Sequence, residues 1–213
     1  MIQAVIFDFD GTILDTERAI FDVWQALFAR FGCTLNESDW LQTIGTREHA
    51  FDPYAVLRAC AGDRDWEAIH AQRRADEWQQ VQNLPILPGV RELIAQVQQR
   101  GLPLGVVSSS PRAWVEGHLS HLGLLHHFAT VWTGDDVPLT KPDPALYLWA
   151  AETLGVAPRN CLTVEDSPNG ALATLRAGMT CVVVPSSMVQ HQPFPDGVLR
   201  LPSLLAFDLG RLG

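Results

Sequence analysis

Two aspartates, separated by one residue, directly follow a short apolar run near the start of the chain. The run covers residues 4–7, and Asp8, Asp10, Gly11 and Thr12 come after it. Two carboxylates at this spacing repel each other, and a divalent cation with oxygen ligands is the simplest partner that keeps both ionised at neutral pH. A carboxylate can also attack phosphorus, and the covalent intermediate divides one difficult displacement into two easier steps. The pair therefore indicates metal-assisted group transfer, with an ordinary turn as the plain alternative.

Three further polar clusters follow later in the chain, at VVSSS (106–110), TKPDP (140–144) and TVEDS (163–167). Each has an ordinary explanation by itself. A loop lysine such as Lys141 is usually solvated, and Glu165 to Ser167 can cap a helix that begins at Pro168. Together with the aspartate pair, however, the clusters supply further carboxylates, a cation and hydroxyl groups. Such a set can hold a metal and an anion at one site.

The four motifs DFDGT, VVSSS, TKPDP and TVEDS, in this order, make the chain resemble the haloacid dehalogenase superfamily. Within that superfamily the chain is most similar to the β-phosphoglucomutase-like phosphatases with a small helical cap, and the resemblance spans nearly the whole sequence. It implies a Mg²⁺-dependent phosphatase that hydrolyses a small phosphate monoester through an aspartyl phosphate. The expected substrate is a sugar phosphate or a related metabolite.

The carboxylates divide into two chemical roles. We expect Asp8 to be the nucleophile and Asp10 to be the general acid and base, because the leaving alkoxide needs a proton and the later water must lose one. The resemblance assigns the same two roles. Asp8 and Asp166 are the side chains that we expect to bind Mg²⁺. The resemblance adds the backbone carbonyl of Asp10, and Glu165 directly or through water.

The remaining groups meet the negative charge of a phosphate. Lys141 can hold Asp8 and the phosphoryl oxygens together, and it is the third expected catalytic residue. Ser108 stands at a predicted strand end just before a helix, where its hydroxyl and nearby N–H groups can bind phosphate oxygens. We expect Ser109, through its amide, and Ser110 to share this task.

These residues need a scaffold that brings distant segments together. From residue 89 onward, predicted strands at 103–107, 130–133, 161–164 and 181–184 alternate with helices, and each polar cluster falls after a strand. This alternation predicts the α/β class, with a doubly wound parallel sheet whose ligand crevice lies at the carboxyl ends of the strands. Asp8, Ser108, Lys141 and Asp166 should meet in that crevice.

The segment between the first strand and residue 84 has a different pattern. Helices are predicted at 17–31, 37–43, 48–61 and 65–82, followed by a linker rich in proline. We therefore expect residues 16–83 to form an inserted, all-helical cap domain, and residues 1–15 and 84–213 to form the core domain. The cap would act as a lid. Its loop, with Gly45 and Arg47, is where the family contacts substrate; a surface arginine is the plain alternative for Arg47.

Several alternative functions are open to the same motifs. A β-phosphoglucomutase-like phosphomutase is the nearest, although Ile20 stands where those mutases have a histidine that positions the sugar. A dehalogenase would not need Asp10 or the metal residues. The usual phosphonatase mechanism needs a cap lysine, and residues 16–83 contain none. A receiver module or a catalytically silent phosphate-binding module is the alternative from a different class.

Composition limits the partners. Among 213 residues 47% are hydrophobic and 18% are charged, as in a globular protein, and the net charge of −9 opposes binding to nucleic acid. No run approaches the roughly 18 apolar residues of a membrane helix. We expect a cytoplasmic monomer with a small phosphorylated metabolite as its partner, without nucleic acid or membrane.

Some conspicuous residues have ordinary interpretations. The cysteines are scattered without metal spacing, so we expect buried free thiols at Cys33, Cys60, Cys161 and Cys181. His118 and His121 lie among leucines and indicate a helix rather than a metal site. Arg73 and Arg74 are expected to be solvated.

Overall fold

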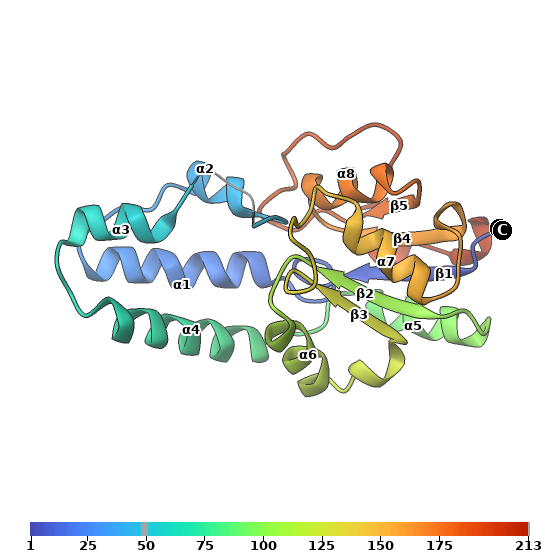
Figure 1. Ribbon diagram of the computed structural model, residues 1–213, viewed down its shortest axis with the longest axis horizontal. Coiled ribbons are helices and arrows are strands. Elements are labelled where there is room, and N and C mark those ends of the chain that lie inside the picture. Colours follow the sequence, from blue (N-terminus) through green and yellow to red (C-terminus); the bar gives the residue numbers. More distant parts are fainter. Residues whose placement is uncertain (48–50, 213) are drawn as a thin grey trace.

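Within the described residues, 1–47 and 51–212 of a computed structural model, six parallel strands form one sheet (Figure 1). The strand order is β3-β2-β1-β4-β5-β6, and every neighbouring pair is parallel. The strands are β1 (Ala4–Asp8), β2 (Leu104–Ser108), β3 (Thr130–Thr133), β4 (Cys161–Glu165), β5 (Thr180–Val183) and β6 (Leu199–Arg200). The predicted doubly wound parallel sheet is confirmed. The strand order reverses direction at β1, which is where such sheets bind ligands.

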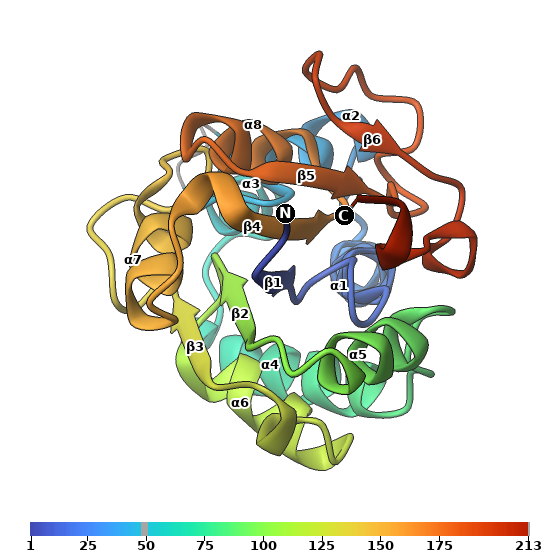
Figure 2. The same ribbon diagram turned by 90° about the vertical axis from the view of Figure 1, so that its right-hand side faces the viewer.

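Helices cover both faces of the sheet (Figure 2). The helices α5 (Val90–Gln99) and α6 (Arg112–His121) pack on one face, and α7 (Ala145–Thr153) and α8 (Pro168–Arg176) pack on the other. Side chains of β1 alternate between the two cores: Val5 and Phe7 join the first, and Ala4 and Ile6 the second. Because both faces are buried, this strand is apolar at consecutive positions.

Short 3-10 turns lie in the connections, the first of them within residues 16–83 and the others around the sheet. They are η1 (Leu41–Thr43), η2 (Leu125–His127), η3 (Pro158–Asn160), η4 (Leu204–Ala206) and η5 (Leu209–Leu212). The C-terminal region contains β6 and the last two of these turns. No helix among the described residues is long and apolar enough to span a membrane.

The described part of residues 16–83, here called the helical segment, lies beyond the carboxyl ends of the strands (Figure 1). They contain α1 (Thr16–Arg30), α2 (Glu37–Trp40), α3 (Pro53–Ala61) and α4 (Trp66–Gln82). In the helix predicted at 48–61, residues 51 and 52 are not helical and α3 begins at Pro53; residues 48–50 lie outside the described residues. Asp52 caps α3 by accepting from the N–H groups of Tyr54 and Ala55, and Pro53 occupies the first turn, where its missing N–H costs nothing.

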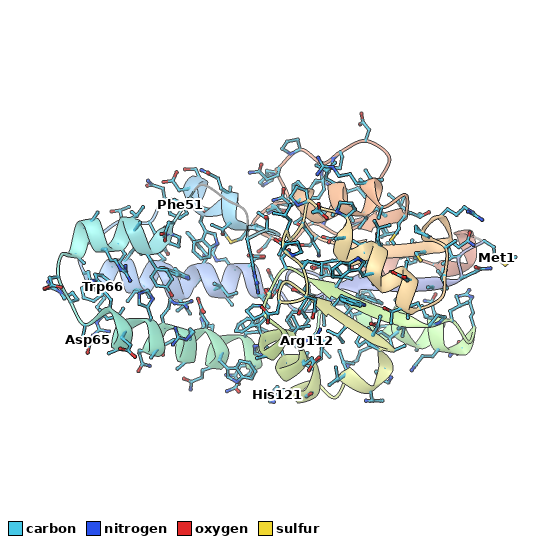
Figure 3. All side chains as sticks on the ribbon, in the orientation of Figure 1. Met1, Phe51, Asp65, Trp66, Arg112 and His121 are labelled. Atoms are coloured by element: carbon cyan, nitrogen blue, oxygen red, sulfur yellow. A yellow bond between two sulfur atoms is a disulfide. The ribbon has the colours of Figure 1, made fainter. Side chains whose placement is uncertain are left out.

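Aromatic and aliphatic side chains pack between the helices of the segment (Figure 3). This core includes Phe21, Trp24, Phe28, Trp40 and Leu57, all of them buried. This third apolar cluster lies mainly within the helical segment, and Met188 and Val189, which follow β5, also contribute to it.

The cysteine prediction is wrong for one pair. Cys33 and Cys60 form a disulfide with an S–S distance of 2.06 Å, whereas Cys161 and Cys181 are buried free thiols as expected. The two bonded residues are 27 positions apart; Cys33 follows α1, and Cys60 lies in α3. Their proximity depends on how these helices pack, which the spacing of the cysteines does not reveal.

His118 connects the helical segment to the core. Its buried ring stacks on Trp78 of α4 at 4.1 Å between centroids and meets Trp114 edge-on at 4.4 Å. Neither ring nitrogen has a hydrogen-bond partner among the described residues. Burial outweighs the opposing charge of Asp10 and lowers the pKa of His118 to about 4. The imidazole is therefore neutral at pH 7, and it packs as an aromatic ring between Trp78 and Trp114.

We expect this histidine to make the fold sensitive to acid. Its pKa is lower in the folded chain than the ordinary value of 6.5, so the stabilisation is present above pH 6.5 and is lost as the pH falls to 4. The loss should reach about 3 kcal/mol. In urea unfolding at pH 7.5 and pH 4, His118→Phe should lose less stability between the two pH values than wild type does. The exposed His191→Phe is the matched control, and an unchanged loss in His118→Phe would contradict the expectation.

Candidate active site

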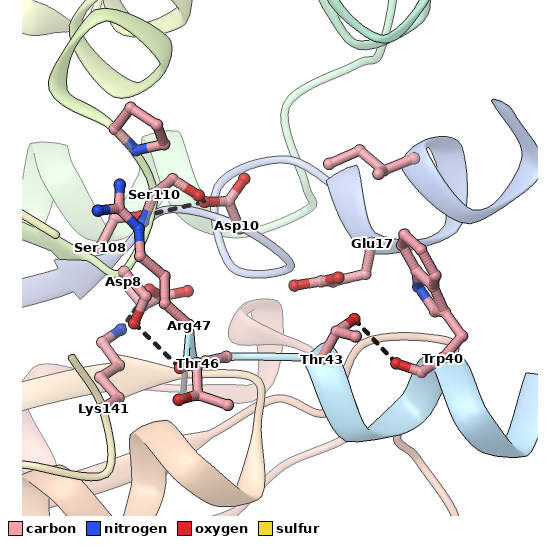
Figure 4. Close-up of a pocket in the computed structure, with 14 residues that line it drawn as sticks. Asp8, Asp10, Glu17, Trp40, Thr43, Thr46, Arg47, Ser108, Ser110 and Lys141 are labelled. Atoms are coloured by element: carbon pink, nitrogen blue, oxygen red, sulfur yellow. Dashed lines mark hydrogen bonds and ion pairs between the residues drawn. The ribbon is translucent and has the colours of Figure 1, made fainter. Parts of the chain in front are cut away.

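The polar clusters of the sequence meet at the carboxyl ends of the central strands. Asp8 ends β1, Ser108 ends β2 and Glu165 ends β4, because parallel strands bring equivalent ends to one edge of the sheet. A cavity of about 200 Å³ lies over this edge (Figure 4). Its lining comes from both the sheet edge and the helical segment: Asp8, Asp10, Glu17, Ile20, Trp40, Thr43, Gly45, Thr46, Arg47, Ser108, Ser109, Ser110, Pro111 and Lys141.

Lys141 links two carboxylates on the floor of this cavity. Its Nζ lies 2.5 Å from Asp8 Oδ1 and 2.7 Å from Glu165 Oε1, and its side chain is 1% exposed. Burial disfavours the charge on Lys141, but the two adjacent carboxylates outweigh this effect and raise its pKa. Burial also raises the pKa of Asp8, to about 8, against the attraction of Lys141. A single lysine therefore balances the charge of two buried carboxylates, Asp8 and Glu165, only in part.

Glu165 uses both of its oxygens inside the protein. Oε1 accepts hydrogen bonds from Lys141 and from the hydroxyl of Tyr147, and Oε2 accepts from the N–H groups of Asp166 at 3.2 Å and Ser167 at 3.5 Å. With these donors in place, Glu165 holds Lys141 in position and has little capacity left for a direct cation contact. Tyr147 was not predicted, because a tyrosine in an apolar helix resembles any core residue.

Asp166 has the opposite surroundings. It is 1% exposed, and its Oδ2 has no hydrogen-bond partner among the described residues. Burial and the charges of Asp8 and Glu165 raise its pKa well above the ordinary value. Oxygen atoms of Asp8, Glu165 and Asp166 lie within 4.8 Å of one another, a spacing suited to a metal ion, and the donors around Glu165 leave Asp8 and Asp166 as the candidates for direct contact. Gly11 lies against Asp166 with φ of +79°. A larger residue at position 11 would clash with the Asp166 carboxylate, because its Cβ would overlap Oδ2.

Asp10 is held by four donors at the side of the cavity. Its Oδ1 accepts from Thr16 Oγ1 and from the indole N–H of Trp114, each at 2.9 Å. Its Oδ2 accepts from Ser110 Oγ at 2.7 Å and from Ser108 Oγ at 3.0 Å. The carboxylate thus has a fixed orientation. The contacts of Thr16 and Trp114 were missed, since each depends on helix placement.

The loop with Gly45 and Arg47 contacts the core directly. Gly45 accepts a hydrogen bond from Ser109 Oγ at 3.0 Å. The Arg47 guanidinium donates to the carbonyl of Gly134 at 3.0 Å and pairs with Asp135 at 3.1 Å. Arg47 lines the cavity, but its charge is shared with Asp135. Contact between Arg47 and a substrate anion therefore stays a prediction.

Glu17 is an acidic cavity residue whose position the sequence analysis did not anticipate. It lies in the first turn of α1, and Figure 4 shows its side chain pointing into the cavity, toward the side where Asp8 and Asp10 lie. Burial, and then the charges of Asp10 and Asp8, raise its pKa well above the ordinary value. An acid at the start of the helix predicted at 17–31 was the available signal.

The fold and the acidic cavity together define an α/β enzyme with a helical insertion after its first strand. The sequence matches the model of the haloacid dehalogenase-like hydrolases over residues 5–184, and the chain belongs to this family. The predicted family and the predicted enzyme class are therefore confirmed.

Curated relatives match along almost their whole lengths. YhcW of Bacillus subtilis (strain 168), provisionally named a phosphatase, is 41% identical over 100% of this chain and 96% of its own length. Hexitol phosphatase B of Escherichia coli (strain K12) is 33% identical over 95% of this chain and 93% of its own length. Both of these relatives are named as phosphatases.

Solved structures of similar proteins have the same overall fold as this chain. CbbY from Rhodobacter sphaeroides in complex with phosphate has a TM-score of 0.77 and 26% identity, covering 97% of this chain and 96% of that chain. A HAD family hydrolase from Deinococcus radiodurans R1, with bound phosphate and sodium, has a TM-score of 0.71 and 26% identity, covering 93% and 90%. Phosphate is therefore a ligand of structurally similar proteins.

Proposed function

We propose that this chain is a Mg²⁺-dependent phosphatase that hydrolyses a small phosphate monoester through an aspartyl phosphate on Asp8. One observation carries the proposal: Asp8, in a buried ion pair with Lys141, and Asp10, held in a fixed orientation by hydrogen bonds, line the same cavity. The names of the relatives support a sugar phosphate or a related metabolite as substrate. A small phosphorylated metabolite is then the partner of the enzyme.

The metal would be held by Asp8 and Asp166, with the backbone carbonyl of Asp10 as a further ligand. The unpartnered Oδ2 of Asp166 and the raised pKa values of Asp8 and Asp166 support this set, because a bound cation would favour the ionised form of both acids. Mg²⁺ supplies positive charge that lets a phosphate dianion approach these carboxylates. In this proposal Glu165 positions Lys141 and approaches the cation through water.

The protein groups perform two successive displacements. An Asp8 oxygen forms a bond to phosphorus while the bond from phosphorus to the leaving oxygen breaks, and Asp10 donates a proton to that oxygen. Asp10 then takes a proton from a water molecule, whose oxygen attacks phosphorus and releases Asp8 and inorganic phosphate. Lys141 balances charge on Asp8 and the phosphoryl oxygens. Ser108 and the Ser109 amide would bind those oxygens.

We also propose that residues 16–83 form a cap domain over a core domain of residues 1–15 and 84–213. The contacts of Gly45 and Arg47 with the core support a lid that excludes water from the cavity. Ile20 lies in the cavity at the position that the mutases use for sugar binding, which favours hydrolysis over transfer back to a sugar. A cytoplasmic location stays a prediction, and the Cys33–Cys60 disulfide weighs against it.

The first test combines activity with metal binding. Release of p-nitrophenol from p-nitrophenyl phosphate should require Mg²⁺ and stop with EDTA. Mg²⁺ alone should raise the melting temperature, since saturation to 100 times Kd adds about 2.7 kcal/mol of stability.

Asp166→Asn should abolish the shift in melting temperature. The exposed Asp196→Asn keeps the same change of charge away from the cavity and should retain the shift. Metal-independent hydrolysis, or an equal shift in Asp166→Asn, would contradict the proposed metal site.

A further inference from the structure

The four donors to Asp10 form two pairs, one for each oxygen of the carboxylate. Ser108 and Ser110 donate to Oδ2, and both serines line the cavity (Figure 4). Thr16 and Trp114 donate to Oδ1, and neither is among the described residues that line the cavity. Oδ2 is therefore the oxygen on the side of the cavity, and Oδ1 is the oxygen held by α1 and α6.

The two pairs of donors differ in how long they stay with Asp10 during the proposed reaction. The Ser108 hydroxyl would turn to the phosphoryl oxygens, and Ser110 is expected to share that task. Oδ2 then loses donors at the moment when an acid is needed. Thr16 and Trp114 have no phosphoryl group to bind, so they still hold Oδ1.

Trp114 suits this task better than a hydroxyl group does. An indole N–H donates and cannot accept, so it stabilises negative charge on Oδ1 and disfavours a proton there. A hydroxyl group, by contrast, can rotate and accept a proton from the same oxygen. Trp114 therefore favours the form of Asp10 in which Oδ2 carries the proton.

The ring of Trp114 is itself held by aromatic neighbours. His118, one turn further along α6, meets it edge-on at 4.4 Å between centroids, and Trp78 of α4 meets it at 5.9 Å with an interplanar angle of 79°. His118 is fully buried and stacks on Trp78. Few rotamers are open to an indole packed in this way, so its N–H stays directed at Asp10.

We propose that Trp114 is a positioning residue, whose indole N–H anchors Oδ1 of Asp10 so that Oδ2 performs the proton transfers. This inference rests on the proposed phosphatase function. In the first displacement the bond between Oδ2 and its proton breaks, and that proton joins the leaving oxygen as its bond to phosphorus breaks. In the second, Oδ2 takes the proton of the attacking water. Without the indole N–H the carboxyl group can rotate away from both.

The test removes the N–H and keeps an aromatic ring. In Trp114→Phe, kcat/KM for ethyl phosphate should fall about tenfold to hundredfold, the size of a lost hydrogen bond to a charged group. For p-nitrophenyl phosphate it should stay within about twofold, because p-nitrophenolate leaves without a proton. Both values report the first displacement, and their ratio within one variant cancels any loss of folded protein.

A matched control separates this effect from the general loss of an indole. The N–H of Trp132 donates to Thr153 Oγ1 at 3.2 Å, and Trp132 is not among the described residues that line the cavity. Trp132→Phe should therefore keep the wild-type ratio of the two substrates. Inhibition by inorganic phosphate should also be unchanged in Trp114→Phe, because the substitution leaves the phosphate-binding residues in place.

A double substitution tests whether Trp114 acts through Asp10. When Asp10→Asn is already present, adding Trp114→Phe should lower kcat/KM for ethyl phosphate by no more than about twofold, because the group that it positions no longer transfers protons. An unchanged substrate ratio in Trp114→Phe, or the same loss with and without Asp10, would overturn the inference. Failure of the proposed function is distinct, because wild type would then hydrolyse neither ester.

Discussion

Asp8→Asn is expected to reduce phosphate release by at least roughly 10³-fold, because an amide is a poor nucleophile toward phosphorus. The substitution keeps the shape of a side chain that is 6% exposed, and Lys141 can still donate to the amide oxygen. The fold should therefore survive. Steady-state hydrolysis of p-nitrophenyl phosphate measures the loss, and the melting temperature reports whether the variant is folded.

Two controls make this result specific. Asp22→Asn removes an acid on the exposed side of α1, where it pairs with Arg18 at 2.9 Å, and should keep wild-type activity. Acid-quenched wild type should carry a phosphoryl adduct of about 80 Da, which is absent in Asp8→Asn. Wild-type rates in the variant, or an adduct mapped to another residue, would reject Asp8 as the nucleophile.

Asp10→Asn is expected to lower kcat by about 10² to 10⁴ for an alkyl phosphate, because such a leaving group must receive a proton. The effect on release of p-nitrophenol should be smaller in the first step, since p-nitrophenolate leaves without a proton. The aspartyl phosphate should then accumulate, because no base takes the proton of the attacking water. A burst of p-nitrophenol followed by slow turnover is the expected time course.

Binding of the product separates this role from simple damage to the site. Inorganic phosphate should inhibit Asp10→Asn with nearly the wild-type inhibition constant, because the floor residues Asp8, Lys141 and Ser108 are unchanged. The amide also keeps an oxygen that can accept from Trp114 or Ser110. A variant with normal kcat and weakened phosphate inhibition would show that Asp10 binds the anion instead of transferring protons.

The two acids differ in their surroundings in a way that suits these tasks. Asp8 is buried beside a single lysine, whereas Asp10 is surrounded by hydroxyl and indole donors at the cavity wall. A nucleophile must stay next to the phosphoryl group, and an acid must face the leaving oxygen. Two of the donors to Asp10, Thr16 and Trp114, lie in α1 and α6, so under the proposed mechanism we expect changes in either helix to affect proton transfer.

The sequence by itself determined the sheet and the floor of the site. Apolar runs of strand length, each followed by polar residues, leave few arrangements other than a parallel sheet, and parallel strands place their carboxyl ends at one edge. Asp8, Ser108, Lys141 and Asp166 could therefore be brought together without coordinates. Helix boundaries were mostly predictable too, except near α3, where a cap at Asp52 shortens the helix.

Only the tertiary structure decided which partner each side chain takes. Trp114 reaches Asp10 across 104 positions, Arg47 pairs with Asp135 across 88, and Cys33 meets Cys60 because two helices pack together. The orientation of Glu17 likewise depends on the rotation of α1. Such contacts depend on the relative placement of whole elements to within about an ångström, because a hydrogen bond weakens steeply beyond its short range. Local patterns of apolar and polar residues determine which elements form, but they do not determine that placement.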